Sequence, residues 1–412
     1  MATTAVCFEA PLSPSYRQLL LWAMACQTSF VMANTLLTHF NRWIEFLGGD
    51  VKMAGWIMGT GPVLGLLARP WVGQWINRWG ATRVWLVGYA VFAAGIGGNL
   101  VYPTLTALFA YRAALVLGSA LVFTSSLTYI TLAAPPDRRT EAIGLLGAGG
   151  FIGMIAGPSL GDWILGPPPR SADDFYRLFM TALVILTIAT LGMRFLQTPM
   201  HETRVSAPAR LSDFVRTSRQ YWPGSILVTN LVFGLCMAVP FVFLASYVDA
   251  YKIRVGSLPA ISIFFWGYAG WGLFVRITSA RVADRWCRRR VLIWGLVLMG
   301  LGMLSYLWVP TGDSWRLLIP ALVCGTAHAV VFHTMVSLSI EPFADEVRGT
   351  GSALSLMTQD LGMIGGAPIL GQIAAAWGFN ALFVTVAIAC LAAAAVYGWS
   401  TFLFESQSRT AG

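Results

Sequence analysis

The side chains of this sequence that could do chemistry are the few titratable groups that lie within apolar segments. Asp360, Arg112, His328 and His333 each lie inside an apolar run rather than in a polar loop. An ionised side chain in a membrane-spanning helix is costly, so it faces the protein interior and marks a site of binding or proton transfer. We therefore take Asp360, His328 and His333 as candidates for proton coupling and Arg112 as a candidate functional residue.

Asp360 is the strongest of these candidates. No other acidic residue lies in the apolar run 351–377, and a lone carboxylate in apolar surroundings favours its neutral, protonated form. A group that gains and loses a proton at this depth is what a proton carrier requires. The alternative interpretation is a structural aspartate that caps a neighbouring helix.

Arg112 and the two histidines leave a similar choice open. Arg112 either faces a partner in the protein interior or extends its side chain to the membrane surface. A histidine titrates near neutral pH and can relay protons, whereas the alternative is a histidine that only packs. His328 and His333 diverge by roughly 140° on a helix, so they cannot share one metal ion, and we predict no metal site.

The composition indicates that these apolar segments cross a membrane. Hydrophobic residues make up 57% of the chain, charged residues 11%, and the mean hydropathy is +0.67, whereas a soluble domain carries roughly 25% charged residues. We therefore predict an all-α integral membrane protein with twelve membrane-spanning helices in two pseudo-symmetric bundles of six. Apolar runs of about 20 residues, which suffice to cross a bilayer, begin near Leu19, Met53, Val84, Leu105, Ala142, Phe175, Gly224, Pro259, Val291, Leu317, Gly351 and Ala381.

The two halves of the chain follow one plan. Three arginines recur after 207 residues, and two glycines recur after 209 residues. The pairs are Arg69 and Arg276, Arg78 and Arg285, Arg83 and Arg290, Gly153 and Gly362, and Gly157 and Gly366. Self-similarity of this kind indicates a duplicated unit. We expect a first half at residues 1–197, a cytoplasmic connection at 198–221 and a second half at 222–412.

The basic residues predict the orientation in the membrane. Most of the 27 lysine and arginine residues lie in segments that an internal N-terminus would place in the cytoplasm. We therefore expect a multi-pass protein of the cell (inner) membrane with both termini cytoplasmic. The net charge of +9 fits this topology and an attraction to anionic membrane lipid. No segment offers the basic face of a soluble domain that nucleic-acid binding would need.

Polar residues within the predicted spans are candidates for lining a substrate cavity. Gln27 and Asn34 are seven residues apart and share one face of a helix. Such a face turns toward the protein interior or a wet cavity, or it only hydrogen-bonds a neighbouring helix. The cavity candidates are Gln27, Asn34, His39, Asn230 and Tyr247.

The loop after the second predicted span resembles a motif of the major facilitator superfamily. The residues that match are Gly73, Arg78, Gly80 and Arg83, and Asn77 replaces the aspartate of the family pattern. The second-half copy keeps the acidic and basic residues as Asp284 and Arg285, but has Ala280 and Cys287 at the glycine positions. In this family the motif implies charge pairing between the halves in the outward-open state. Asn77 implies a weaker pairing in the first half.

The fifth predicted span carries a second resemblance to this family. Its residues Gly153, Gly157, Pro158 and Gly161 match a pattern that implies antiporters rather than importers. Small residues four apart also allow close helix packing, and a proline bends a helix. Because the eleventh span repeats the pattern imperfectly, part of the signal is shared packing geometry.

Arg112 followed by Gly118 matches a fourth-span pattern that in this superfamily is associated with proton coupling in exporters. The run Asp360-Leu361-Gly362 is similar to the drug and sugar efflux subgroup, often called arabinose-efflux-like. The resemblance to the superfamily covers essentially the whole chain. It implies a monomeric carrier without a cofactor, which exchanges protons for a small organic molecule by alternating access. The alternatives are a symporter or uniporter of the same fold and, more remotely, a polytopic enzyme or a sensor. No nucleophile motif or paired carboxylates indicate an enzyme.

Overall fold

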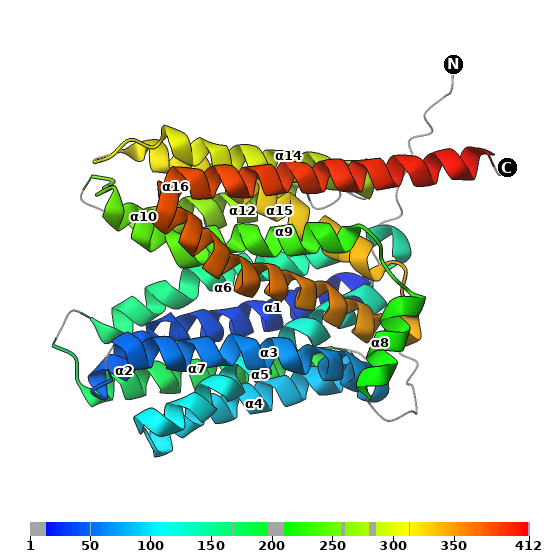
Figure 1. Cartoon of the computed structure of the whole chain (residues 1–412). Coiled ribbons are helices and arrows are strands. Elements are labelled where there is room, and N and C mark those ends of the chain that lie inside the picture. Colours follow the sequence, from blue (N-terminus) through cyan, green and yellow to red (C-terminus); the bar gives the residue numbers. More distant parts are fainter. Residues whose placement is uncertain are drawn as a thin grey trace.

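The computed structural model describes residues 14–49, 51–166, 169–196, 210–256, 260–279, 286–312 and 314–410. These residues form two helical bundles, which lie one above the other in Figure 1. The first bundle contains α1 (Pro14–Leu36), α2 (Phe40–Phe46), α3 (Val51–Trp79), α4 (Ala81–Val101), α5 (Leu105–Ala133), α6 (Arg139–Leu165) and α7 (Ala172–Gly192). Within it, α1 packs on α6 and α7, and α5 packs on α3 and α4.

The second bundle repeats this arrangement. It contains α9 (Ile226–Ala238), α10 (Leu244–Ala250), α11 (Ala260–Phe265), α12 (Trp271–Thr278), α14 (Arg288–Ser305), α15 (Leu318–Ile340) and α16 (Arg348–Thr410). Here α9 packs on α16, and α14 packs on α15 and α16. The pairing of α1 with α6 therefore has its counterpart in the pairing of α9 with α16.

Nine helical segments among the described residues are long and apolar enough to cross a membrane. The last of them has 58 residues and bends at Gly378, where φ is 80°, so α16 turns back on itself (Figure 1). The helix α3 and the segment α11–α12 stand at the places of the second and eighth predicted spans. This arrangement is consistent with the twelve spans predicted from the sequence.

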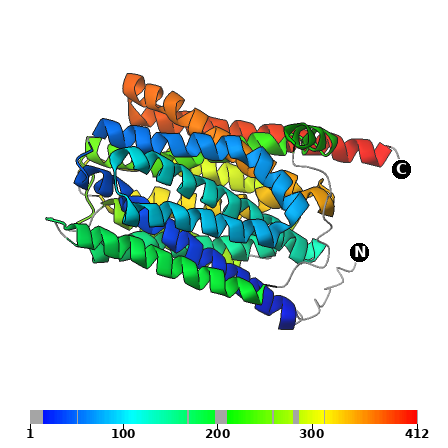
Figure 2. The same cartoon turned by 90° about the horizontal axis from the view of Figure 1, so that it is seen from below.

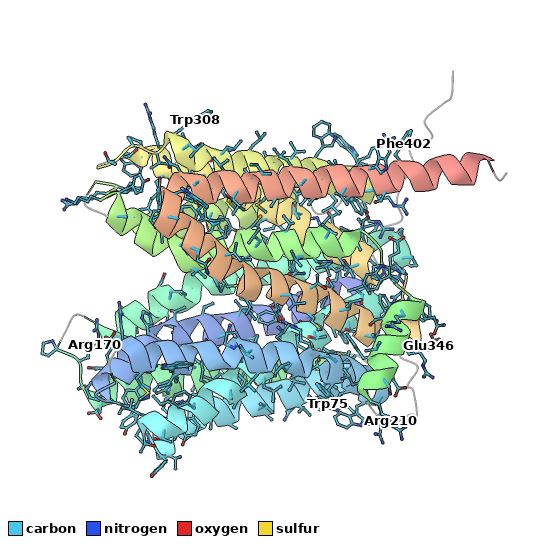
Figure 3. All side chains as sticks on the ribbon, in the orientation of Figure 1. Trp75, Arg170, Arg210, Trp308, Glu346 and Phe402 are labelled. Atoms are coloured by element: carbon cyan, nitrogen blue, oxygen red, sulfur yellow. The ribbon has the colours of Figure 1, made fainter. Side chains whose placement is uncertain are left out.

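The outer surface matches a membrane environment. Large apolar side chains project from it, among them Trp308 and Phe402 (Figure 3), which are 69% and 66% exposed. The labelled charged residues Arg170, Arg210 and Glu346 lie at the two ends of the bundles instead. A belt of exposed apolar side chains between charged ends is the pattern that a bilayer requires.

The short helix α8 (Leu211–Gln220) defines one end of the molecule, which we call the α8 end. It packs against α3 and α16, with Phe214 buried while Leu211 and Val215 remain exposed. The beginning of α1 and the end of α16 lie at the same end of the molecule (Figure 2). The remainder of the predicted connection, 198–209, lies outside the described residues.

Several spans are interrupted by irregular turns. A 3-10 turn, Leu37–His39, separates α1 from α2. Two π-helical turns, Val239–Phe243 and Trp266–Gly270, divide the seventh and eighth spans, and Pro240 explains the first of these because it lacks a backbone N–H. Such turns often accompany functional sites in helical proteins.

The turns after α3 and before α14 hold their backbone at positive φ. Gly80 has φ 89° and ψ 153° and precedes α4, while Cys287 has φ 74° and ψ 100° and precedes α14. These residues are 207 positions apart, so the repeat extends to the backbone although the second copy has lost its glycine. Glycine adopts such angles readily, whereas a residue with a side chain is strained by about 1–3 kcal/mol.

Replacing Cys287 by glycine should therefore stabilise the protein. The strain relieved exceeds the added backbone entropy of glycine in the unfolded chain, about 0.4–1 kcal/mol. We expect Cys287→Gly to raise the midpoint of thermal unfolding in detergent, followed by tryptophan fluorescence. The reverse exchange at the matching turn, Gly80→Cys, should lower it. Equal midpoints for Cys287→Gly and wild type would show that this turn is not strained.

Candidate functional site

The bundles meet most closely where α3 crosses α16. A Cβ atom at Gly73 would lie 2.8 Å from Ala353 Cβ and 2.9 Å from the carbonyl oxygen of Gly349, so only glycine fits at this crossing. One turn further, Asn77 Nδ2 donates to Thr350 Oγ1 at 2.7 Å. The asparagine that replaces the family's aspartate thus joins the halves through a neutral hydrogen bond rather than a charge pair.

Further hydrogen bonds between the bundles lie near the same end. Thr128 Oγ1 donates to Ser352 Oγ at 2.8 Å, Thr140 Oγ1 donates to Ser337 Oγ at 3.0 Å, and Arg348 Nη1 donates to the Thr131 carbonyl at 2.7 Å. These bonds join the parts of α5, α6, α15 and α16 that lie toward α8. These hydrogen bonds therefore join the two bundles at the α8 end.

The remaining residues of the loop motif lie elsewhere. Arg78 and Arg83 are exposed at the surface of the α8 end, and Gly80 forms the turn described above. Asp284 and Arg285 lie outside the described residues, so the predicted role of this motif in the conformational change remains a prediction.

An ion pair crosses between the bundles beyond these hydrogen bonds. Arg69 Nε on α3 donates to Asp360 Oδ2 on α16 at 2.5 Å, and Arg69 Nη1 donates to Thr124 Oγ1 at 3.1 Å. The Arg69 side chain is 9% exposed and that of Asp360 is 32% exposed. The expectation that Asp360 is a lone carboxylate is wrong, because its counter-ion comes from a helix 291 residues away.

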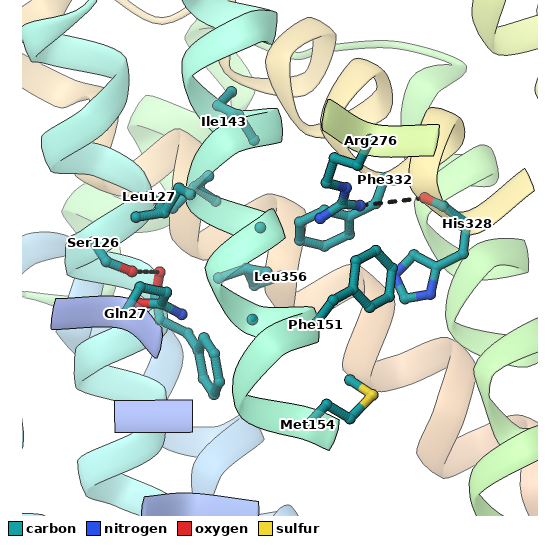
Figure 4. A pocket seen from close by; sticks show the side chains of 14 residues that line it. Gln27, Ser126, Leu127, Ile143, Phe151, Met154, Arg276, His328, Phe332 and Leu356 are labelled. Carbon is teal, nitrogen blue, oxygen red and sulfur yellow. Dashed lines mark hydrogen bonds between the residues drawn. The ribbon is translucent and has the colours of Figure 1, made fainter. Parts of the chain in front are cut away.

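A pocket of about 140 Å³ lies between the bundles. Gln27, Ser126 and Phe151 line it from the first bundle, and Arg276, His328 and Phe332 line it from the second (Figure 4). The wall is mostly apolar and contains few polar groups, as is usual for small-molecule sites. Residues from both bundles shape the pocket, so a relative movement of the bundles would change it.

Arg276 is the most unusual side chain of this pocket. It is 2% exposed, and its guanidinium lies 4.6 Å from the ring centroid of Phe151 and 5.5 Å from that of Phe332. Nη2 donates to the His328 carbonyl oxygen at 3.4 Å, whereas Nε is buried without a hydrogen-bond partner. Cation–π contact with the two rings therefore contributes to the stabilisation of this buried charge. Arg276 is not among the site residues predicted from the sequence, although its repeat with Arg69 within a span is a signal that could have indicated it.

The histidines have different surroundings. The His328 Nδ1 atom lies 2.5 Å from the Tyr268 hydroxyl, and its ring contacts Phe151 edge-on. His333 is 1% exposed and faces Gly144 of the first bundle, but it does not line the pocket.

Gln27 also lines the pocket, and its buried Oε1 has no hydrogen-bond partner. Of the predicted residues, the structure brings Gln27 and His328 together at the pocket.

Two other cavity candidates lie in the interior of the second bundle. Asn230 donates to Ser339 Oγ at 2.8 Å and accepts from Ser355 Oγ at 3.1 Å, so it joins α9, α15 and α16. Tyr247 packs against Tyr306 and Phe383. Neither residue lines the pocket, and substrate contact by them remains a prediction.

The other candidates of the first bundle also lie away from the pocket. Asn34 accepts a hydrogen bond from Ser119 Oγ at 3.3 Å, and His39 Nε2 lies 3.2 Å from the Pro158 carbonyl oxygen. Arg112 lies within α5, and its Nε is buried without a hydrogen-bond partner. Its role in proton coupling stays a prediction.

The glycines of the fifth span form the contact between α6 and α1. A Cβ atom at Gly153 would lie 2.7 Å from the Met32 nitrogen, and one at Gly157 would lie 2.6 Å from the Met32 carbonyl oxygen. A Cβ atom at Gly161 would instead meet the side chain of His39, in the turn that follows α1. In the second bundle Gly362 meets the backbone of Leu231 at the equivalent contact of α16 with α9. Shared packing thus accounts for the repeated glycines, and the link to antiport remains a prediction.

This contact predicts a position-specific effect on stability. Gly157→Ala would force α6 away from the α1 backbone, at a cost of about 1–3 kcal/mol typical of overpacking. The matched control is Gly150→Ala on the same helix, where a Cβ atom would meet nothing within 4 Å. We expect a lower unfolding midpoint in detergent for Gly157→Ala alone. Equal midpoints for the two variants would contradict the close contact.

The ion pair predicts unequal effects of removing its two members. Asp360→Asn leaves the buried Arg69 cation without a counter-ion, which costs about 3–5 kcal/mol in buried pairs. Arg69→Gln leaves a carboxylate that is 32% exposed and can be solvated or protonated, so the loss should be smaller. The midpoints of thermal unfolding of both single variants and the double variant show whether Asp360→Asn destabilises the protein more than Arg69→Gln. A larger loss for Arg69→Gln would contradict it.

Comparison with known proteins agrees with this architecture. The family model described as Major Facilitator Superfamily matches residues 19–286 and 253–410. A protein of Serratia proteamaculans named "Multidrug resistance protein MdtG" is 24% identical over 275 residues, which cover 66% of this chain and 64% of that relative. The chain therefore spans less than two thirds of the length of this relative.

Solved structures of transporters share the fold at low sequence identity. The human organic anion transporter MFSD10 superimposes with a TM-score of 0.78 at 16% identity, covering 93% of this chain and all of that chain. The Escherichia coli fucose:proton symporter FucP gives 0.76 at 16% identity, covering 93% and 98%. Two pseudo-symmetric helical bundles around a shared pocket and a family match along most of the sequence place this chain in the major facilitator superfamily.

Proposed function

We propose that the protein exports a small organic molecule in exchange for protons. The observation that carries this proposal is the Arg69–Asp360 ion pair, because it connects the two bundles through a group that a proton can neutralise. The pocket between the bundles offers a place for the substrate. The printed name of the Serratia relative, a multidrug resistance protein, supports efflux.

The described conformation corresponds to an outward-facing state under this proposal. The basic residues predict cytoplasmic termini, and the α8 end would then be the cytoplasmic end. Hydrogen bonds between Asn77 and Thr350 and between Thr128 and Ser352 close that end. Access to the pocket would come from the opposite, external side.

Proton binding would weaken the contact between the bundles. A proton from the external side would reach Asp360, whose side chain is 32% exposed, and neutralise it. Arg69 would then lose the charge attraction that holds α3 to α16, and the bundles could rock toward an inward-facing state. Release of the proton into the cytoplasm would re-form the pair. A proton thus moves inward as the substrate moves outward.

Transport in everted membrane vesicles tests this mechanism. Respiration acidifies the vesicle lumen, and an antiporter dissipates the pH gradient when its substrate is added. We would add benzenesulfonate, ethidium and fucose as anionic, cationic and neutral probes to vesicles with wild type, Asp360→Asn or Asp213→Asn. Asp213 lies on α8 outside both bundles, so its variant is a matched control.

We expect at least one probe to collapse the gradient in wild type and in Asp213→Asn, but not in Asp360→Asn. Movement of a probe without any pH response in wild type would instead indicate a uniporter. A probe that is loaded into the lumen beforehand and leaves it together with protons would indicate a symporter. Normal coupling in Asp360→Asn would exclude Asp360 as the proton carrier.

A further inference from the structure

The pseudo-symmetry of the two bundles exposes a difference between their buried arginines. Arg69 and Arg276 are equivalent positions, 207 residues apart, on α3 and α12. The partner of Arg69 is Asp360 on α16. The glycine repeat between α6 and α16 has an offset of 209 residues, which makes Phe151 the counterpart of Asp360. Phe151 therefore occupies the position from which a carboxylate would pair with Arg276.

The contacts of Arg276 agree with this substitution. Its guanidinium lies over the Phe151 ring, just as Arg69 meets Asp360 across the bundle interface. Among the residues that the structure describes, no carboxylate lies within ion-pair distance of Arg276. The side chain is 2% exposed, and its Nε has no hydrogen-bond partner. A buried cation in this condition favours an external counter-ion.

The pocket places this cation where a ligand can meet it. Arg276 lines the pocket together with Phe151, Phe332 and Gln27 (Figure 4). Two aromatic rings provide an apolar surface, and the buried Oε1 of Gln27 adds an unsatisfied polar group. An apolar cavity of roughly 150 Å³ holds one benzene molecule. The pocket, at about 140 Å³, is therefore of the size that one aromatic ring of a ligand would fill.

We propose that Arg276 is the anion-binding group of this pocket and that the substrate is a small organic anion with an aromatic or similarly apolar body. The negative group would pair with the guanidinium, and the ring would pack against Phe151 and Phe332. The first-half arginine is neutralised within the protein, whereas the second-half arginine is left for the substrate. This inference deepens the proposed transport function and rests on it.

Equilibrium binding of two compounds with similar shapes and different charges tests whether the pocket prefers an anion. Benzenesulfonate is permanently anionic, whereas benzenesulfonamide has nearly the same shape and is neutral at pH 7. We would measure the affinity of both for the purified full-length protein in detergent by ligand-observed NMR titration. A charge-assisted hydrogen bond in a buried site predicts a preference of about tenfold or more for the sulfonate in wild type.

Three variants assign that preference to Arg276. Arg276→Gln should bind both compounds equally. Phe151→Asp should also lose the preference, because it supplies the internal counter-ion that the second half lacks and recreates the arrangement of Arg69 with Asp360. The matched comparison is Phe151→Leu, which removes the ring but adds no charge: it should weaken the binding of both compounds to a similar extent and so keep the preference for the sulfonate.

Several outcomes would overturn the proposal. Equal affinity for the two compounds in wild type, no saturable binding of benzenesulfonate at millimolar concentrations, or an unchanged preference in Arg276→Gln would each do so. The last outcome would assign Arg276 to cation–π packing alone. Should Arg276→Gln fail to fold, Phe151→Asp decides, because it retains the arginine and compensates its charge.

The same assay distinguishes this inference from the proton mechanism. Binding in detergent needs no gradient, so Asp360→Asn should retain the preference for the sulfonate even where it abolishes proton exchange. Intact anion binding in wild type together with no proton coupling in wild-type vesicles would refute the mechanism alone. Proton-coupled transport of ethidium or fucose without anion binding would refute the anion site alone.

Discussion

The structure depends on the cost of placing charge in an apolar interior. Arg69 is almost fully buried, and a buried cation is tolerated when a counter-ion and hydrogen bonds satisfy it. Asp360 and Thr124 supply these. The close approach of α3 and α16, which Gly73 permits, is what brings this ion pair together across the two bundles.

The duplicated halves meet the same requirement differently. One arginine has a carboxylate across the interface, and its counterpart, Arg276, has the faces of two aromatic rings. A guanidinium suits both environments because it is planar and more weakly hydrated than an ammonium group. Asp360 neutralises the charge of Arg69, whereas the aromatic rings leave the positive charge of Arg276 uncompensated beside the pocket. The difference between the halves thus lies at the centre of the molecule.

The glycine positions show how a motif can have a structural explanation of its own. In the sequence, the glycines of the fifth span resembled a motif with a functional meaning. In the structure they allow α6 to contact the backbone of α1, and Gly362 allows the same contact of α16 with α9. A helix pair that touches backbone to backbone can move as one rigid unit, which rocking of whole bundles requires.

The sequence by itself determined the membrane class, the twofold repeat and the presence of charged groups within spans, because apolar length and residue spacing are local properties. Of the candidate residues in the sequence, Gln27 and His328 line the pocket. Only the tertiary structure decided which polar residues meet. Asn230 and Tyr247 belong to the interior of the second bundle, and a polar residue in a span looks the same in a sequence whether it faces a pocket or a neighbouring helix. The pairing of Asp360 with Arg69 joins residues 291 positions apart, and the isolation of Arg276 depends on what α6 places opposite it. Such contacts arise from the packing of one bundle on the other, which no single span encodes.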